Sequence, residues 1–247
     1  TLVFIKTDSL KHRIFTLLSL LSGVYIIIAS GTRGAWLSFL LLMGIYLIFF
    51  YRQKTKFNAL VKIITILFFA GLLSVGSFNQ SVKDRVYTAK IEISNWVSGD
   101  KTPSSVGLRL DMYTKAIDNI EDVPFFGHGY RTSNIVLFQN DSSSMGRISV
   151  GYNHLHNAYL TNYYNGGIVL LGALLLLLFV PLRIFVRANS QNRENPVFIS
   201  GALLTLGYAS FGMVNILFGD TYMNGFYVLF LAIFLLLTNK SIKTSEV

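Results

Sequence analysis

Six long apolar segments constrain the fold of this chain more than any other feature of its sequence. Most are 16 to 22 residues long, and a helix of that length crosses the roughly 30 Å hydrocarbon core of a bilayer. They span Ile14–Ala29, Gly34–Tyr51, Ala59–Phe78, Gly166–Val186, Val197–Phe218 and Tyr222–Thr238. The sequence therefore predicts an all-α, polytopic integral membrane protein with six transmembrane helices.

The composition supports a membrane protein and excludes some kinds of site. Charged residues make up only 13% of the chain, about half the share in a soluble domain. No cysteine is present, which excludes disulfides and thiolate metal sites. The chain opens with Thr1 and has no signal-peptide pattern, so we expect it to be the later part of a longer membrane protein.

The basic residues predict the orientation in the membrane. Twelve lysines and arginines fall in the connections on one side if every segment crosses once, and the positive-inside rule makes that side cytoplasmic. The other face then holds the turn 30–34, the long loop 79–159 and the turn 219–221, which contains Asp220. The long loop carries eight basic and eight acidic residues. Because the positive and negative charges of the loop cancel, the net charge of +9 of the chain gives no support to nucleic-acid binding.

This pattern divides the chain into three parts. Residues 1–78 are expected to hold three transmembrane helices, 79–160 a periplasmic loop with an amphipathic helix, and 161–247 three more helices and a cytoplasmic tail. Ser104 or Ser105 can cap the loop helix, and Pro124 closes it. Residues 132–151 are rich in serine, which predicts a mobile segment that could form a lid.

Two arginines on the predicted non-cytoplasmic face are candidates for anion binding. Arg33 heads an apolar segment, where it either anchors the helix at the interface or meets an anionic head group. Arg109 lies near the start of the loop helix, where free backbone amides also favour an anion. The alternative for Arg109 is an ordinary solvated arginine.

Two histidines stand at the mouth of the fourth apolar segment. A neutral imidazole can act as general base for a hydroxyl nucleophile, so His154 and His156 are either catalytic or hydrogen-bonded interfacial residues. On a helix their spacing would point them to different faces, which argues against a metal site. Asn157 could orient an imidazole or a sugar hydroxyl. Tyr159 could stack on a sugar or belong to an interfacial aromatic belt.

Three motifs resemble the O-antigen ligase and O-antigen polymerase superfamily. The first is Thr32-Arg33-Gly34-Ala35 at the head of an apolar segment. The second runs from Gly107 to Tyr113 and is followed by Pro124-Phe125-Phe126-Gly127-His128-Gly129. The third is His154-Leu155-His156-Asn157, with Gly166-Gly167 ten residues further on. Their order and spacing around one large loop fit that superfamily.

The resemblance implies a membrane glycosyltransferase of the GT-C type in the bacterial inner membrane, with its active face periplasmic. An O-antigen ligase of enteric type transfers O-antigen from undecaprenyl diphosphate to a hydroxyl of lipid A–core oligosaccharide, with inversion and without metal or other cofactor. By motif match, Arg33 and Arg109 would hold the diphosphate, and His156 would lie at the reacting centre. His154, Asn157 and Tyr159 would contact substrate. The alternatives are a polymerase that extends the lipid-linked glycan, a transporter of lipid-linked glycan, and a non-catalytic scaffold.

Overall fold

The computed structural model describes residues 10–52, 80–191, 195–216, 218–219 and 221–245, without the side chains of some helical residues. Every regular element in these ranges is helical, which confirms the all-α prediction for the described residues. In chain order they are α2 (Leu10–Ala29), α3 (Arg33–Arg52), α5 (Gln80–Val97), α6 (Ser105–Asp118), the 3-10 helix η1 (Ile120–Asp122), α7 (Ser133–Phe138), α8 (Ser144–Ser149), α9 (Ala158–Gln191), α10 (Pro196–Gly212) and α11 (Thr221–Ser245).

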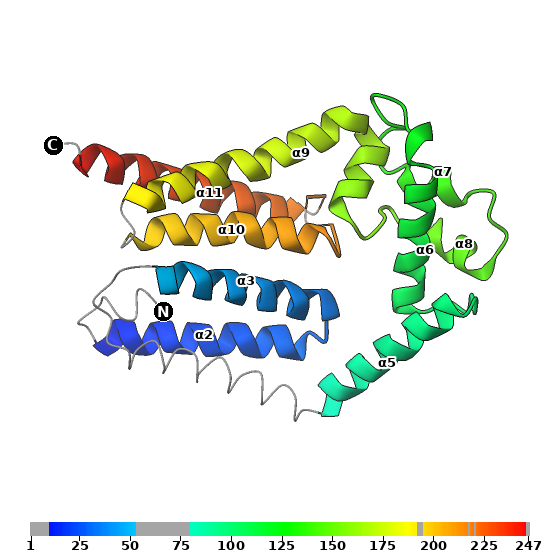
Figure 1. The fold of residues 1–247 in the computed structure, drawn as a ribbon, viewed down its shortest axis with the longest axis horizontal. Helices are drawn as coiled ribbons and strands as arrows, with labels where there is room; N and C mark the ends of the chain where they lie inside the picture. Colours follow the sequence, from blue (N-terminus) through cyan, green and yellow to red (C-terminus); the bar gives the residue numbers. More distant parts are fainter. Residues whose placement is uncertain (1–9, 53–79, 192–194, 217, 220, 246–247) are drawn as a thin grey trace.

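The long apolar helices form a bundle with the polar helices gathered at one end. Helices α2, α3, α9, α10 and α11 lie side by side, while α5 to α8 cover the end where α9 begins (Figure 1). Helix α10 packs against α9, α11 and α3. A cluster that includes Phe185, Tyr208 and Tyr227 forms the core between α9, α10 and α11. This packing holds the three C-terminal helices together through buried aromatic area.

Two of the described helices are long and apolar enough to cross a membrane, namely Ala158–Asn189 and Thr221–Ser241. Gly34–Leu47 and Pro196–Gly212 are shorter apolar helices. Many large apolar side chains on α9 and α11 are exposed, such as Phe179 at 61% and Leu236 at 70%. A chain with such faces buries them against lipid or further helices. The predicted segment Ala59–Phe78 lies outside the described residues, so the count of six spans stays a prediction.

The fourth apolar helix starts earlier than predicted and is broken by two glycines. Helix α9 begins at Ala158, and its backbone leaves helical geometry at Gly166 and Gly167, where φ of Gly167 is +63°. A Cβ on Gly167 would collide with the backbone of Phe125, and a Cβ on Gly127 would lie 2.5 Å from the backbone of Asn165 and Gly166. Gly167 thus admits a loop backbone at the break in α9.

The long loop contains more ordered structure than predicted. The predicted loop helix is confirmed as α6, and Ser104 is its N-cap, accepting from the amide of Gly107 at 3.1 Å. Helix α5 was not predicted, because most of its side chains are polar or exposed. The predicted mobile segment 132–151 instead holds α7 and α8, with Phe138 and Met145 buried.

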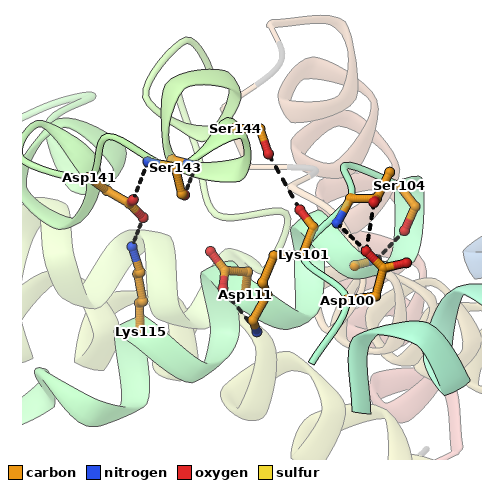
Figure 2. A network of polar contacts seen from close by, with 11 residues as sticks. Asp100, Lys101, Ser104, Asp111, Lys115, Asp141, Ser143 and Ser144 are labelled. Carbon is orange, nitrogen blue, oxygen red and sulfur yellow. Dashed lines mark hydrogen bonds and ion pairs between the residues drawn. The ribbon is translucent and has the colours of Figure 1, made fainter. Parts of the chain in front are cut away.

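A polar network ties this segment to α6 (Figure 2). Lys115 of α6 forms an ion pair with Asp141, whose carboxylate also accepts from the amide of Ser143 at 2.9 Å. Hydrogen bonds from Lys115 and Ser143 lower the pKa of Asp141 to about 2. The hydroxyl of Ser144 donates to the carbonyl of Lys101 at 3.4 Å. These contacts explain why a serine-rich stretch is folded.

Candidate active site

A cavity of about 480 Å³, lined by both polar and apolar residues, lies where the bundle meets the loop helices. Three separate stretches of the chain build its wall: the turn between α2 and α3, the facing parts of α5 and α6, and the end of α10 with the residues that follow it. The lining residues are Ser30, Gly31, Thr32, Gly34, Leu37, Arg85, Ser105, Val106, Arg109, Leu110, Tyr113, Phe211, Val214 and Asn215. The cavity has the size of a small-molecule site, and it joins the first two predicted motifs.

The turn before α3 brings the first motif to the cavity. Gly31 has φ of +61°, and the hydroxyl of Ser30 accepts from the amide of Thr32 at 3.2 Å. A Cβ on Gly34 would lie 2.8 Å from the side chain of Val214, so a glycine here allows α3 to approach the end of α10. Arg33 is the first residue of α3, and its side chain lies outside the described part of the structure.

Arg109 lines the cavity, and only some of the hydrogen-bond donors of its guanidinium have partners. Its Nη1 donates to the carbonyl and the hydroxyl of Ser105, at 3.2 and 3.1 Å. Its Nε is buried and has no hydrogen-bond partner among the described residues. A buried donor without a partner is costly, and an incoming anion would satisfy it.

The two histidines lie on one side of an irregular segment before α9. Leu155 between them is fully buried, and its amide donates to the hydroxyl of Thr161 at 3.0 Å. With Leu155 turned inward, the two imidazoles meet, and their ring centroids are 4.6 Å apart. Since the segment is not helical, the expectation that the histidines diverge does not apply. No group of three metal-ligating side chains gathers in the part of the chain that the structure describes.

His156 is held in an unusual backbone conformation. Its φ is +51°, a value that non-glycine residues seldom adopt. The hydroxyl of Tyr113 on α6 donates to the carbonyl of His156 at 2.8 Å. The ring of Tyr152 contacts the imidazole edge-on, with centroids 5.0 Å apart. These contacts tie the histidine segment to the helix that carries Arg109.

The surroundings of both imidazoles favour the neutral form. Burial lowers the pKa of His156 to about 4, and the positive charges of His154 and Arg109 act in the same direction. Burial also lowers the pKa of His154. Hydrogen bonding to Asn215 opposes both shifts. The Nδ1 of His156 is buried and has no partner among the described side chains. A neutral imidazole with a free nitrogen can accept a proton.

The other two candidates beside the histidines, Asn157 and Tyr159, form hydrogen bonds within the protein. The Oδ1 of Asn157 accepts from the amides of Tyr159 and Leu160, both at 3.0 Å, and its Nδ2 donates to the carbonyl of Met213 at 3.1 Å. The hydroxyl of Tyr159 donates to the carbonyl of Ala209 at 2.8 Å. Asn157 therefore caps α9 and joins it to α10. Direct substrate contact by these two side chains stays a prediction.

Comparison with known proteins places these motifs in a family. The sequence profile described as O-antigen ligase matches residues 17–175, which is more than half of the chain and includes all three motifs. The chain belongs to the O-antigen ligase family. The resemblance seen in the sequence is therefore confirmed. Together with the two apolar helices, membership of the O-antigen ligase family indicates a membrane protein with the character of a glycosyltransferase.

One curated relative is similar over much of the chain, and its name gives no function. An uncharacterized protein of Haemophilus influenzae is 26% identical over 196 residues, which cover 78% of this chain and 49% of the relative. The chain thus spans about half the length of the relative that it matches. Activity of a whole O-antigen ligase is accordingly treated as a proposal below.

The structure of this O-antigen ligase family member adds three residues that the sequence did not single out. Tyr113 follows Arg109 by four residues on α6, and this helical spacing could have identified it. Arg85 lies on α5, which was not predicted. Asn215 lies beyond the part matched by the family profile, and only tertiary packing brings it to the cavity and the two histidines.

Proposed function

We propose that this chain carries the active site of an O-antigen ligase that transfers a glycan from undecaprenyl diphosphate to a hydroxyl of lipid A–core oligosaccharide. The observation that carries the proposal is the cavity, which Arg109 and the turn before Arg33 line, while Arg109 and Asn215 also neighbour the pair of histidines outside its lining. We further propose six transmembrane helices and a location in the bacterial inner membrane. The distribution of lysine and arginine supports a periplasmic position for the cavity.

The proposed reaction is a direct displacement at the anomeric carbon. The acceptor oxygen forms a bond to that carbon while the bond from carbon to the phosphate oxygen breaks, and the configuration inverts. The acceptor hydroxyl proton passes to His156. The leaving diphosphate takes the electron pair of the broken bond.

The arginines supply the second part of the mechanism. Negative charge grows on the leaving phosphate, and preorganised cations stabilise that charge in the transition state. Arg109, with its unsatisfied Nε, and Arg33 at the head of α3 are the residues proposed for this role. His154, Asn157 and Tyr159 are proposed to line the acceptor side. No cofactor is required by this scheme.

The proposal is tested by transfer of lipid-linked glycan in vesicles that contain the full-length protein. Arg109→Ala, Arg33→Ala and His156→Ala should each reduce transfer about 100-fold or more, with the protein still inserted. Arg147→Ala is a matched control, because Arg147 lies on α8 and does not line the cavity. Near-normal transfer by His156→Ala would show that His156 is not the general base.

The ligase and the polymerase differ in the acceptor. Both fit the family and the cavity, and the polymerase is the second candidate. Restoring the full-length gene to a deletion strain separates them. A ligase places glycan on lipid A–core, whereas a polymerase lengthens the glycan on its carrier.

A transporter or a scaffold would give other results in the same experiments. Purified protein that joins donor to acceptor in detergent argues against a transporter. A scaffold would tolerate loss of Arg109 and His156.

A further inference from the structure

The cavity at the end of the bundle is lined by a second arginine, which comes from a separate helix. Arg85 of α5 lines the cavity together with Arg109 of α6. Arg85 is exposed, which places it at the cavity's edge, whereas Arg109 lies deeper. No carboxylate appears among the described residues that line the cavity, and neither arginine takes part in an ion pair between described side chains. Two cations with no counter-ion among the described residues favour the binding of an anion.

A specific contact with α6 orients α5 so that Arg85 faces the cavity. The carboxylate of Glu92 on α5 accepts from the amide of Val106 in the first turn of α6, at 3.0 Å. Arg85 precedes Glu92 by seven residues, which is about two helical turns, so both lie on the same face of α5. Lys83 and Lys90 differ from the direction of Arg85 by about 160° and about 140° on a helical wheel. Glu92 thus fixes which basic residue of α5 reaches the cavity.

The turn of the first motif accommodates the Arg85 side chain. A Cβ on Gly31 would lie 3.6 Å from Nη2 and 3.7 Å from Nε of Arg85. The guanidinium therefore lies over the glycine of the turn that leads into Arg33. Arg85 is in this way placed between the turn before α3 and the start of α6, which are the two elements that carry the proposed diphosphate ligands.

We infer that Arg85 is a further binding residue for the diphosphate of the polyprenyl carrier, acting at the edge of the cavity while Arg109 acts within it. The inference rests on the proposed function for the identity of the anion. A planar guanidinium can give paired hydrogen bonds to phosphate oxygens. A diphosphate has two phosphoryl groups, and two arginines at different depths can each engage one of them.

Binding of undecaprenyl diphosphate to the full-length protein in nanodiscs tests this inference, with undecaprenol as the uncharged comparison. Arg85→Ala should weaken binding of the diphosphate about tenfold or more, as expected for one charge-assisted hydrogen bond, and leave binding of undecaprenol unchanged. Arg85→Lys should recover part of the loss. In the transfer assay, Arg85→Ala should raise KM for the donor more than it lowers kcat.

Lys83→Ala is the matched control, since it removes a positive charge from the same helix on another face. Equal binding by Arg85→Ala and Lys83→Ala overturns the inference. So does a fall in the thermal unfolding midpoint of both Arg85→Ala and Arg85→Gln, because that marks a structural role. A wild-type protein that binds the diphosphate through Arg85 but transfers no glycan upholds the inference and refutes the proposed transferase.

Discussion

The acid limb of the pH–rate profile offers a demanding test of the proposed base. A general base acts only when it is unprotonated, and kcat/KM reports the pKa of the free enzyme. Burial holds the pKa of His156 at about 4, below its ordinary value of 6.5. Transfer should therefore stay constant as the pH falls from 7.5 through 5.5, and it should decline only near pH 4.

The size of the effect follows from the two pKa values. At pH 5.5, a group with a pKa of 4 is about 97% unprotonated, whereas a group with a pKa of 6.5 is only about 9% unprotonated. The proposed environment therefore preserves about tenfold more active enzyme at that pH. The cause is loss of hydration around the charged imidazole, strengthened by the neighbouring positive charges of His154 and Arg109.

The assay is initial-rate transfer with donor well below KM, from pH 4 to pH 8 at constant ionic strength. The variant His154→Gln tests the direction of the shift in the pKa of His156. Because the charge of His154 lowers the pKa of His156, its removal should move the acid limb to higher pH. An acid limb near pH 6.5 in the wild type, or no acid limb down to pH 4 in either protein, would refute the assignment of His156 as a buried neutral base.

Three further predictions concern contacts that support the fold or position the proposed base. Gly167→Ala should lower the free energy of unfolding by about 2 kcal/mol or more, because its Cβ would collide with Phe125. The measurement is thermal unfolding in detergent. As the control, Gly172→Ala should change the free energy of unfolding little, because its Cβ would meet no other part of the protein within 4 Å. Tyr113→Phe should reduce kcat/KM about tenfold, since it removes the hydrogen bond to the His156 carbonyl; unchanged activity would contradict a positioning role. Asp141→Asn should cost about 1 kcal/mol of unfolding free energy at pH 7. Because the folded pKa of Asp141 is about 2, below its ordinary 3.8, that deficit should shrink as the pH falls from 4 towards 2, and a deficit independent of pH would contradict it.

Several features of this protein could be predicted from the sequence because local composition determines them. Helix formation and membrane character follow from long apolar runs, which satisfy their own backbone hydrogen bonds. Helix α6 was predicted with its cap because Ser104 and the apolar stripe after it are neighbours in the chain. The three motifs also indicated the family, since their order in the chain suffices for that.

Other features depend on tertiary structure because they join residues far apart in the chain. Gly167 admits the backbone of Phe125 at the break in α9, a close approach that the sequence alone does not reveal. The histidines were expected to diverge, but the burial of Leu155 before α9 turns both imidazoles to one side. Arg85 and Asn215 enter the site from α5 and from the end of α10. Their meeting depends on helix packing and on the hydrogen bond from the Val106 amide to the Glu92 carboxylate. The apolar runs predicted a bundle, whereas only the packing at the end of that bundle assembled the cavity.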